Sequence, residues 1–434
     1  MQPSPGTPSL AFLDGLFRKA IAAAHPEGCL IPHLPPPPAN GRLVILAAGK
    51  AAGSMTEVAE RHYLEAAGLA PLRLAGLTVT RHGYARPTRC IEMIEAGHPV
   101  PDAAGFAATE RALALADTAT EGDLVLVLLS GGASANWIAP AQGLAFADKQ
   151  ALTRALLRSG ANIGEMNAVR KHLSRIKGGR LAMRAQPARV VTLAISDVPG
   201  DDPAVIGSGP TVPDPATLAD ARAVLARYRL DVPPAVARAL DDPGNETPKP
   251  SDPMFDLTEY RMIARPADAF RATEAAVRAA GYQCIVLGDR IEGEARAVAA
   301  EHAKHAFKIQ QAGQRAVILS GGELTVTIKG KGRGGPNQEY ALALAIALRG
   351  APGIAALASD TDGTDGGGGT ASDPAGAAVD EATLKKASAL GLDPAYFLTD
   401  NDSTGFFERI GGLIQTGPTF TNVNDFRAIL VDRP

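Results

Sequence analysis

Residues 124–134 read Leu-Val-Leu-Val-Leu-Leu-Ser-Gly-Gly-Ala-Ser, an unbroken apolar run followed directly by a loop of small residues. A run without polar alternation is typical of a strand that is buried on both faces of a parallel sheet. Residues 43–47 and 189–195 form similar, mostly apolar runs, and helical patterns such as 103–117 and 147–158 lie between them. Strands that alternate with helices indicate βαβ units, so the sequence predicts an α/β fold with a covered parallel sheet.

The composition changes over residues 230–262, where a series of prolines interrupts the pattern of strands and helices. A chain of 434 residues is long enough for two or three domains. We therefore expect a helix over 10–24 and a Pro-rich connector within residues 1–40, a first domain over 41–245 and a second domain over 260–434. The elements expected in the second domain are helix 267–280, strand 284–288, helix 292–311, strands 315–319 and 324–328, helix 337–348, and strands 354–358 and 428–431.

The overall composition excludes several classes of protein. The 43 Lys and Arg residues nearly balance 46 Asp and Glu, so the chain lacks the excess positive charge of a nucleic-acid binder. No stretch reaches 18 apolar residues, so we expect no membrane span. The cysteines Cys29, Cys90 and Cys284 are too widely spaced for a zinc site or a disulfide framework, which favours a reducing compartment. Without a basic segment followed by an apolar leader, a cytoplasmic location is expected.

Glycine, serine and aspartate gather directly after five of the expected strands. In an open α/β sheet, ligands bind beyond the carboxyl ends of the strands. Five such loops therefore predict a ligand-binding edge, where a single loop would be explained equally well by a plain turn. The loops are Ala48–Gly53, Ser130–Ser134, Ser196–Asp202, Ser320–Glu323 and Ser359–Asp365.

The first two loops suit an anion. Lys50 follows Gly49 at the start of a predicted helix. A cation there interacts unfavourably with the positive end of the helix dipole, and a bound anion would offset that interaction. The loop Ser130–Ser134 offers several backbone amides and two hydroxyl groups, which suit a phosphate or a carboxylate as well as they suit a plain turn.

The two acidic loops predict a magnesium site. Magnesium is usually held by one or two carboxylates together with phosphate oxygens. Aspartate in a glycine-rich loop also forms turns, so we expect only one or two of the six loop aspartates to face the metal. Of Asp197, Asp201, Asp202, Asp360, Asp362 and Asp365, the candidates are Asp197, Asp362 and Asp365.

Residues 329–339 read Lys-Gly-Lys-Gly-Arg-Gly-Gly-Pro-Asn-Gln-Glu, with three cations among four glycines ahead of a predicted helix. A flexible backbone with cations suits a loop that closes on polyphosphate, and a solvated basic hairpin is the alternative. Arg333 is the best candidate for transition-state charge, because a guanidinium binds phosphoryl oxygens bidentately. In a second basic segment, Arg170 or Lys171 is a candidate for a substrate carboxylate, although both also complement the carboxyl end of a helix.

Several well-known motifs are absent from the sequence. It contains no G-x-x-x-x-G-K-[ST], which excludes a P-loop enzyme, and no G-x-S-x-G elbow for a nucleophilic serine. No strict G-x-G-x-x-G follows a strand, which weakens a dinucleotide-binding interpretation, and the protein-kinase signatures are missing.

Between about residue 43 and residue 431, the sequence contains a series of long motifs. They are Ala48–Ala51, Gly97–Asp102, Ser130–Gly132, Asn167–Ser174, Ser196–Pro203, Ser208–Thr211, Ser320–Glu323, Gly332–Gly335 with Asn337–Glu339, Thr361–Gly366, and Thr416–Thr419 with Asn422–Asp425. With these motifs in the family's order, the chain resembles the class II glycerate 2-kinases, a family also labelled as hydroxypyruvate reductases.

The resemblance implies a Rossmann-like α/β/α domain and a smaller α/β domain of the MOFRL type, with the active site in the cleft between them. It also implies transfer of the γ-phosphoryl group of ATP to the 2-hydroxyl of D-glycerate with Mg²⁺, and reliance on Lys50 and Arg333. The partners are then a small substrate and a nucleotide, without nucleic acid or membrane, and a homodimer is compatible with this. The residues expected to bind substrate or phosphate are Gly49, Ser130, Gly131, Gly132, Ser134, Arg170, Lys171, Ser320, Gly321, Gly322, Glu323, Gly334 and Asn337.

The sequence departs from the family pattern at two places. Pro336 stands where the family more often has a second arginine, and the run Gly366–Gly369 is looser than the usual turn.

Two other functions stay open at this point. An NAD(P)H-dependent reductase of hydroxypyruvate, or of a tartrate-derived acid, would also bind a short hydroxy acid in a Rossmann-like fold, although the dinucleotide fingerprint is missing. A metabolite sensor without catalytic activity is the third interpretation, although no appended DNA-binding or partner domain is recognisable.

Overall fold

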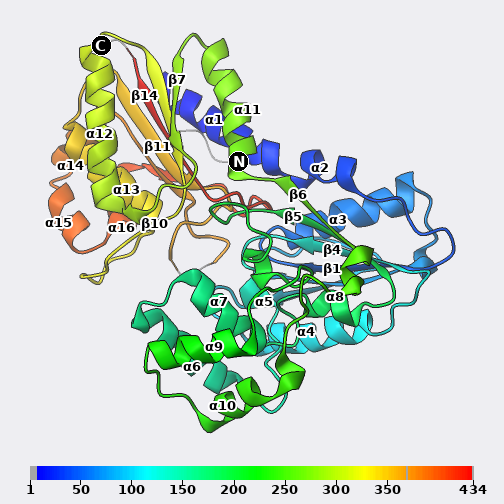
Figure 1. Cartoon of the computed structure of the whole chain (residues 1–434). Helices are drawn as coiled ribbons and strands as arrows, with labels where there is room; N and C mark the ends of the chain where they lie inside the picture. Colours follow the sequence, from blue (N-terminus) through cyan, green and yellow to red (C-terminus); the bar gives the residue numbers. More distant parts are fainter. Residues whose placement is uncertain (1–6, 368–369, 433–434) are drawn as a thin grey trace. The chain divides into compact units, whose positions relative to one another are not determined.

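The computed structural model describes residues 7–367 and 370–432, so Gly368 and Gly369 of the predicted loose turn lie outside the described residues. The chain forms two compact units, one of Leu30–Ile263 and the other of Met1–Cys29 with Ala264–Pro434. Each unit is built on a six-stranded sheet (Figure 1). Among the described residues, none of the helices combines the length and apolar character needed to cross a bilayer.

The sheet of the first unit has the strand order β3-β2-β1-β4-β5-β6. This is the order of doubly wound sheets, in which the chain reverses direction across the sheet between β1 and β4. The pairings among β1 to β5 are all parallel, as the sequence predicted. The strands are β1 (Leu43–Ala48), β2 (Leu74–Arg81), β3 (Glu92–Ala96), β4 (Leu124–Leu129), β5 (Arg189–Ile195) and β6 (Thr258–Ala264).

Both faces of the central strands are covered. Every residue of β1 and of β4 is buried, and side chains alternate between the two faces of a strand. Four further helices pack into a separate small core beside the sheet (Figure 1). The helices of this unit are α3 (Ala52–Arg61), α4 (Ala103–Ala116), α5 (Ala133–Asn136), α6 (Phe146–Ser159), α7 (Ile163–His172), α8 (Arg180–Arg184), α9 (Leu218–Arg227) and α10 (Pro234–Asp241), of which α6, α7, α9 and α10 form the small core.

The sheet of the second unit has the order β13-β12-β11-β14-β9-β7 and is mostly antiparallel. Strand β14 runs antiparallel to both of its neighbours, β9 and β11, and among the described pairs of this sheet only β7 and β9 are parallel. The strands are β7 (Gln283–Gly288), β9 (Ala316–Gly321), β11 (Ile354–Asp360), β12 (Gly376–Val379), β13 (Leu413–Ile414) and β14 (Asp425–Val431), with a two-stranded ribbon of β8 (Gly293–Glu294) and β10 (Leu324–Thr325).

The N-terminal helix packs within the second unit. Helix α1 (Pro8–Ala24) lies beside α11 in Figure 1, and its Phe17 ring is 6.0 Å from the ring of Phe426 on β14. The predicted helix over 10–24 is thus present, and the compact unit that contains it also contains the C-terminal residues. The helices of this unit are α1, α2 (Pro26–Cys29), α11 (Pro266–Ala279), α12 (Ala295–Gln311), α13 (Pro336–Leu348), α14 (Thr383–Ala389), α15 (Pro394–Thr399) and α16 (Ser403–Ile410).

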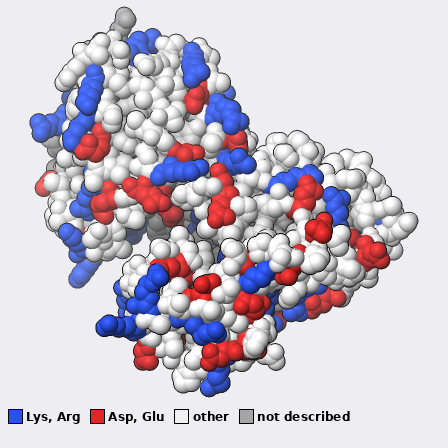
Figure 2. Space-filling view, in the orientation of Figure 1, with Lys and Arg blue, Asp and Glu red and all other residues white. Residues whose placement is uncertain are grey.

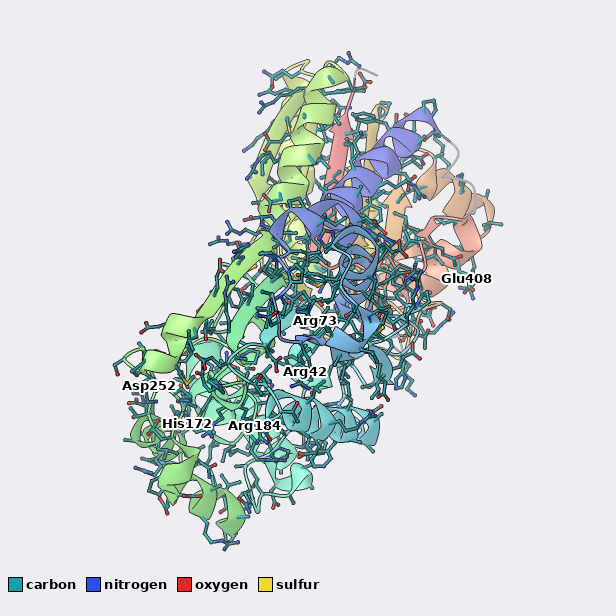
Figure 3. The ribbon with its side chains drawn as sticks, turned by 90° about the vertical axis from the view of Figure 1, so that its right-hand side faces the viewer. Arg42, Arg73, His172, Arg184, Asp252 and Glu408 are labelled. Carbon is teal, nitrogen blue, oxygen red and sulfur yellow. The ribbon has the colours of Figure 1, made fainter. Side chains whose placement is uncertain are left out.

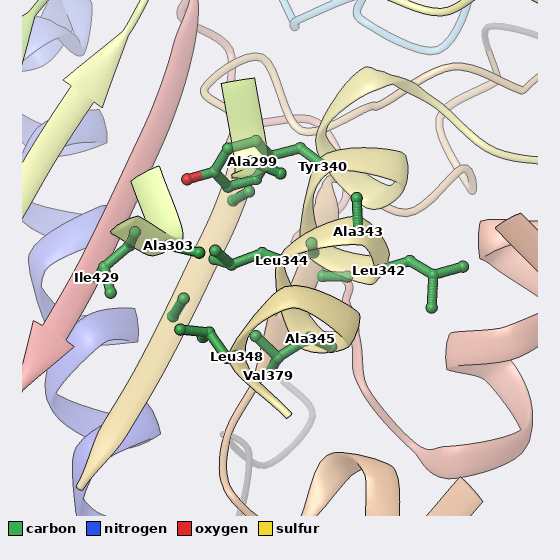
Figure 4. Packing of buried hydrophobic residues seen from close by; sticks show 14 of the residues in the cluster. Ala299, Ala303, Tyr340, Leu342, Ala343, Leu344, Ala345, Leu348, Val379 and Ile429 are labelled. Atoms are coloured by element: carbon green, nitrogen blue, oxygen red, sulfur yellow. The ribbon is translucent and has the colours of Figure 1, made fainter. Parts of the chain in front are cut away.

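Helix α13 is the centre of the second unit's core. Its residues from Asn337 to Ala345 are all buried, so it lacks the polar stripe of a surface helix. Figure 4 shows Leu344 of α13 beside Ala303 of α12, and Tyr340 beside Ala299. Small side chains on α12 let the two helices approach closely, and the position of α13 in turn places the loop that precedes it.

Replacing Leu344 by alanine should lower the free energy of unfolding of the second unit by about 2–5 kcal/mol, because Leu344 is fully buried and the surrounding helix cannot collapse into the cavity. Denaturant unfolding measures the loss. The matched control is Leu390→Ala, where the leucine is 56% exposed and a change within about 0.5 kcal/mol is expected. Equal effects of the two substitutions would contradict the central place of α13.

Candidate functional site

In the first unit, the loops after β1 and β4 touch at the point where the strand order reverses. The Lys50 amide donates to the Gly131 carbonyl oxygen over 2.8 Å, and the Ala51 amide donates to Ser130 Oγ over 2.9 Å. A Cβ atom at Gly49 would lie 2.4 Å from Ser130 Oγ, and Gly49 has a φ of +120°. Only glycine fits this position. The hydroxyl of Ser130 therefore serves the turn that presents Lys50, and the loop backbone forms the floor beneath it.

The side chains of Lys50 and His98 meet over Gly132. A Cβ atom at Gly132 would lie 3.3 Å from Lys50 Cγ and 2.9 Å from His98 Cδ2. Both side chains are half-buried. His98 was not among the predicted site residues, although its motif, Gly97–Asp102, was one of those that carried the resemblance. The two cationic or ionisable groups and the bare glycine together form a surface suited to an anion at a ligand-binding edge.

Ser134 lies at the start of α5, two residues beyond Gly132. Its hydroxyl lies 2.9 Å from Ser208 Oγ, and its carbonyl oxygen accepts a hydrogen bond from Lys177 Nζ over 2.9 Å. The sequence predicted a binding role for Ser134 but for neither of these partners, although Ser208 begins one of the motifs that carry the resemblance. Ser208 is 1% exposed and Lys177 is 3% exposed, so the cluster is closed to solvent on that side.

Arg170 and Lys171, the two residues predicted to bind a substrate carboxylate, have different surroundings. Lys171 is buried and its Nζ lies 3.4 Å from Asp214 Oδ1, a carboxylate that also accepts from Thr247 Oγ1. Lys171 is thereby engaged inside the protein, as is its neighbour His172 with Glu246 (Figure 3 labels His172). Arg170 is half-buried and makes one long contact, 3.5 Å to Asn167 Oδ1, which leaves most of its donors for a ligand.

In the second unit, the ends of three strands form one edge. Strands β9 and β11 end where β14 begins, because β14 runs antiparallel to both. Ser320, Gly321, Gly322 and Glu323 lie at this edge, as predicted from the sequence, but Glu323 is exposed. The buried guanidinium of Arg427 donates to the carbonyl oxygens of Gly321 and Gly322 over 2.6 and 3.2 Å. This arginine fixes the course of the glycine loop.

Asp365 caps helix α13. Its Oδ1 accepts from the Asn337 amide over 2.9 Å, and its Oδ2 accepts from the Gln338 amide over 2.8 Å and from Gln338 Nε2 over 3.0 Å. Burial raises the pKa of Asp365 to about 7, and the amide donors oppose that rise. A carboxylate whose two oxygens are both used in this way is a helix cap and a poor metal ligand.

The other predicted metal ligands lie in different surroundings. Asp362 Oδ1 accepts from the amide and the hydroxyl of Thr364, and Asp362 is 1% exposed. Asp197, after β5 in the first unit, is half-buried. Within residues 7–367 and 370–432, no group of three or more His, Cys, Asp or Glu residues is arranged to hold a metal ion.

The glycine-rich loop ahead of α13 is fixed by hydrogen bonds, contrary to the flexible loop expected from its composition. The amides of Lys329 and Gly330 donate to Asn401 Oδ1 over 2.8 and 3.0 Å. Those of Lys331, Gly332 and Arg333 donate to Asp400 or Asp402. The glycines are needed for close packing: a Cβ atom at Gly334 would lie 2.1 Å from Ser403 Oγ.

Arg333 extends from this fixed loop into solvent. Its side chain is 67% exposed and its Nη2 lies 3.1 Å from Oε2 of Glu408, which is 62% exposed and is labelled in Figure 3. An ion pair this exposed contributes little to stability, so a ligand oxyanion can replace Glu408 without a large loss.

The residues that follow Arg333 begin α13. Gly335 is its N-cap, and Pro336 takes the first helical position, where a missing amide is tolerated. Asn337 Nδ2 donates to Asp425 Oδ1 over 2.6 Å, which ties the helix to the start of β14. Pro336 therefore suits the start of the helix, at the position where the family more often has arginine. Asn337 Nδ2 donates to both Asp365 and Asp425 and so connects these two buried carboxyl groups.

On the face shown in Figure 2, basic and acidic side chains alternate without a continuous patch of one sign. The surface therefore agrees with the near-zero net charge and offers no electrostatic footprint for nucleic acid on that face. The concentrated charge of the first unit is internal, among Lys149, Arg170 and Lys177.

Comparison with known proteins identifies the family. The model of a family described as Domain of unknown function (DUF4147) matches residues 12–241, and the model of the MOFRL family matches residues 316–425. A protein of Thermotoga maritima named D-glycerate 2-kinase is 39% identical over 94% of this chain and 95% of its own length. The chain belongs to the class II glycerate kinase family.

Two further relatives extend the comparison. A crystal structure of a glycerate kinase from Thermotoga maritima superimposes with a TM-score of 0.84 at 38% identity, covering 97% of this chain and 99% of that one. A protein of Agrobacterium vitis with the provisional name hydroxypyruvate reductase is 47% identical over 96% of this chain and 94% of its own length. The α/β fold with a second sheet, which was expected from the resemblance, is thus confirmed over nearly the whole chain.

The internal charge predicts an unusual dependence of stability on pH. Lys149 is 8% exposed, its Nζ donates to the Leu173 carbonyl oxygen, and burial, with Arg170 and Arg180 nearby, lowers its pKa to about 7. Between that value and the unfolded value of about 10.4, the unfolded chain holds a proton that the folded protein has released. Rising pH therefore favours the folded state in this window.

The free energy of unfolding of wild type should accordingly rise relative to that of Lys149→Met as the pH increases from 7 to 10, by up to about 1.4 kcal/mol per pH unit. Denaturant unfolding of both proteins at several pH values measures this difference. The exposed Lys304, paired with Glu301, supplies the control: Lys304→Met should run parallel to wild type. Parallel curves for Lys149→Met as well would show that the Lys149 pKa is not lowered.

Proposed function

We propose that the chain is a glycerate 2-kinase, which transfers the γ-phosphoryl group of ATP to the 2-hydroxyl of D-glycerate and yields 2-phosphoglycerate and ADP. The observation that carries the proposal is similarity along nearly the whole chain to a D-glycerate 2-kinase, with the matching fold of a glycerate kinase structure. The hydroxypyruvate reductase interpretation has only a provisional name of relatives in its favour.

Phosphoryl transfer requires positioning and charge stabilisation rather than a covalent nucleophile. Lys50 supplies an ammonium group at the N-terminus of α3, on a turn held by the loop after β4. We assign it to the phosphoryl group, whose charge it stabilises together with the positive end of the helix. Gly49, Gly131 and Gly132 keep this surface free of side chains, and Ser130 holds the turn.

We assign to Arg333 the binding of the phosphoryl oxygens of the nucleotide. Its exposed guanidinium is released from Glu408 at little cost, and its planar fork matches two oxygens at once. The glycine loop Ser320–Glu323, Gly334 and Asn337 support the same edge of the second unit, with Arg427 and Asp365 as the residues that hold it in place.

Magnesium, when bound with the nucleotide, would neutralise charge on the phosphate oxygens. Asp197 fits this role because it is half-buried at the carboxyl end of β5. Asp365 does not fit it, since both of its oxygens accept hydrogen bonds from α13, and Asp362 is held by Thr364.

The position of phosphorylation follows from the substrate's carboxylate. A cation that holds the carboxylate beside the phosphoryl donor presents the neighbouring 2-hydroxyl, and Arg170 is the candidate because Lys171 is paired with Asp214. The 3-hydroxyl lies roughly 1.5 Å further away, and a misplacement of that size costs about a hundredfold in a positioned reaction.

Coupling the reaction to enolase tests the proposal. With D-glycerate and Mg·ATP, a signal without phosphoglycerate mutase is expected, because enolase consumes only the 2-isomer. A signal that requires the mutase would place the phosphate on carbon 3. Consumption of NADH with hydroxypyruvate, without any phosphorylated product, would establish the reductase instead.

Lys50→Ala should lower kcat about a hundredfold or more, since the loss of one preorganised electrostatic donor has an effect of that size. The fold should survive, because the hydrogen bonds of the turn come from the backbone of residues 50 and 51 and remain. Steady-state kinetics and a thermal melt measure both, with the exposed Lys19→Ala as the control. A fully active Lys50→Ala enzyme would refute the assignment.

Arg333→Lys should leave kcat reduced at least about tenfold, because an ammonium keeps the charge but loses the bidentate geometry. The control is Arg278→Lys on α11, where an exposed arginine pairs with Glu274 and full activity is expected. Wild-type turnover in Arg333→Lys would mean that a single solvated cation is sufficient.

A further inference from the structure

The first unit contains three cations that lack an acidic partner. Lys177 is 3% exposed and Lys149 is 8% exposed, while Arg170 is half-buried. Among the residues that the structure describes, none of the three forms an ion pair with a carboxylate. An ammonium removed from water without a counter-charge is destabilising by several kcal/mol, so this arrangement requires an explanation.

The hydrogen-bond partners of the three groups are all neutral. Lys177 Nζ donates to the Ser134 carbonyl oxygen over 2.9 Å and lies 3.4 Å from Ser208 Oγ. Lys149 Nζ donates to the Leu173 carbonyl oxygen over 2.8 Å. Burial lowers the pKa of Lys177 well below its usual value, and the charges of Arg170 and Lys149 lower it further. Without an anion, burial and these neighbouring positive charges therefore favour the neutral form of Lys177, and a bound anion would favour its charged form.

A lack of acidic residues nearby does not explain this. Lys171, on the same helix as Arg170, pairs with Asp214, and His172 pairs with Glu246. The carboxylates Asp214 and Glu246 thus pair with Lys171 and His172, and not with Lys149, Arg170 or Lys177. A bound anion would supply the missing charge.

The unpaired cations adjoin the surface around Lys50. Ser134, which accepts from Lys177, is two residues beyond Gly132, and Gly132 is in contact with Lys50 and His98. Two residues of chain span at most about 7 Å. Ser134 and Arg170 are half-buried, so the cluster reaches the surface at these two residues.

We propose that Lys177 and Arg170, with the hydroxyls of Ser134 and Ser208, form a binding subsite for a small oxyanion, with Lys149 as a third basic group. The oxyanion is the carboxylate of the hydroxy-acid substrate or a phosphoryl group of the nucleotide. That choice rests on the proposed function, whereas the subsite itself rests on the unpaired buried charges. The two hydroxyls, 2.9 Å apart, add donors of the kind that orient such a group.

The test compares Lys177→Met with wild type in kinetics and in binding. In the Met variant, the KM for D-glycerate or the KM for Mg·ATP should rise about 10- to 100-fold, the effect of losing a charge-assisted hydrogen bond. A rise confined to D-glycerate identifies the carboxylate, and a rise confined to Mg·ATP identifies the phosphoryl group. Lys177→Arg, which keeps the charge, should recover at least part of the affinity, and Lys304→Met should leave both constants unchanged.

Direct binding separates the subsite from the proposed function. D-glycerate, ATP and inorganic phosphate are each added to the unreacted protein, and the thermal-melt shift and the calorimetric Kd are measured. At least one of the three should stabilise wild type, and that stabilisation should be lost in Lys177→Met. If wild type has no kinase activity, the proposed function fails while this comparison still decides the subsite.

The proposal is overturned if Lys177→Met binds all three compounds as wild type does and keeps both KM values within about twofold. A fall in kcat alone, with unchanged binding, would overturn it equally, since it would assign Lys177 a purely structural role. If Lys177→Met does not fold, Arg170→Met replaces it, because its single 3.5 Å contact contributes little to the fold, and the same outcomes apply.

Discussion

The contact between the loops after β1 and β4 is the constraint on which the first unit's site depends. Gly49 lies so close to Ser130 that no side chain fits between them, and Ser130 Oγ accepts the amide of Ala51. Each loop thereby restrains the backbone conformation of the other, and this restrained backbone positions Lys50. This contact lies where the strand order of the parallel sheet reverses, the point at which open α/β sheets bind ligands.

The second unit reaches a comparable result by different means. Its edge is held by buried charges: Asp365 on the N-terminus of α13 and Arg427 on the carbonyl oxygens of the glycine loop. Both groups are almost fully removed from solvent, and each forms several hydrogen bonds, although Arg427 Nε has no partner among the described residues. The edge therefore adjoins the core around α13, part of which is shown in Figure 4.

Much of this organisation could be predicted from the sequence. The runs at 43–47, 124–129 and 189–195 form parallel strands because an unbroken apolar run requires cover on both faces. The strands β12 and β13 could not be predicted, because four- and two-residue strands carry no measurable periodicity, and their pairing depends on chain far away in sequence. The antiparallel entry of β14 between β9 and β11 is a long-range choice of the same kind.

The site shows the same division. Glycine and charge patterns made Lys50, Arg333 and the strand-end loops candidates, because these residues adjoin recognisable strands or helices, and their roles stay predictions. The pairing of Lys171 with Asp214, the cap formed by Asp365, and the cluster around Lys177 depend on contacts between segments dozens of residues apart. Composition alone also suggested a mobile loop at 329–335, whereas glycine there permits close packing against residues 400–403.

That loop has a consequence for how Arg333 changes its partner. Each amide from Lys329 to Arg333 is already committed to Asp400, Asn401 or Asp402, so backbone movement would break several hydrogen bonds together. The guanidinium can exchange Glu408 for a ligand through rotation of its own side chain alone. The entropy of ordering this segment is then lost when the protein folds and not when the ligand binds. Under the role proposed for Arg333, residues 400–402 would thereby contribute to ligand affinity although they need touch no ligand.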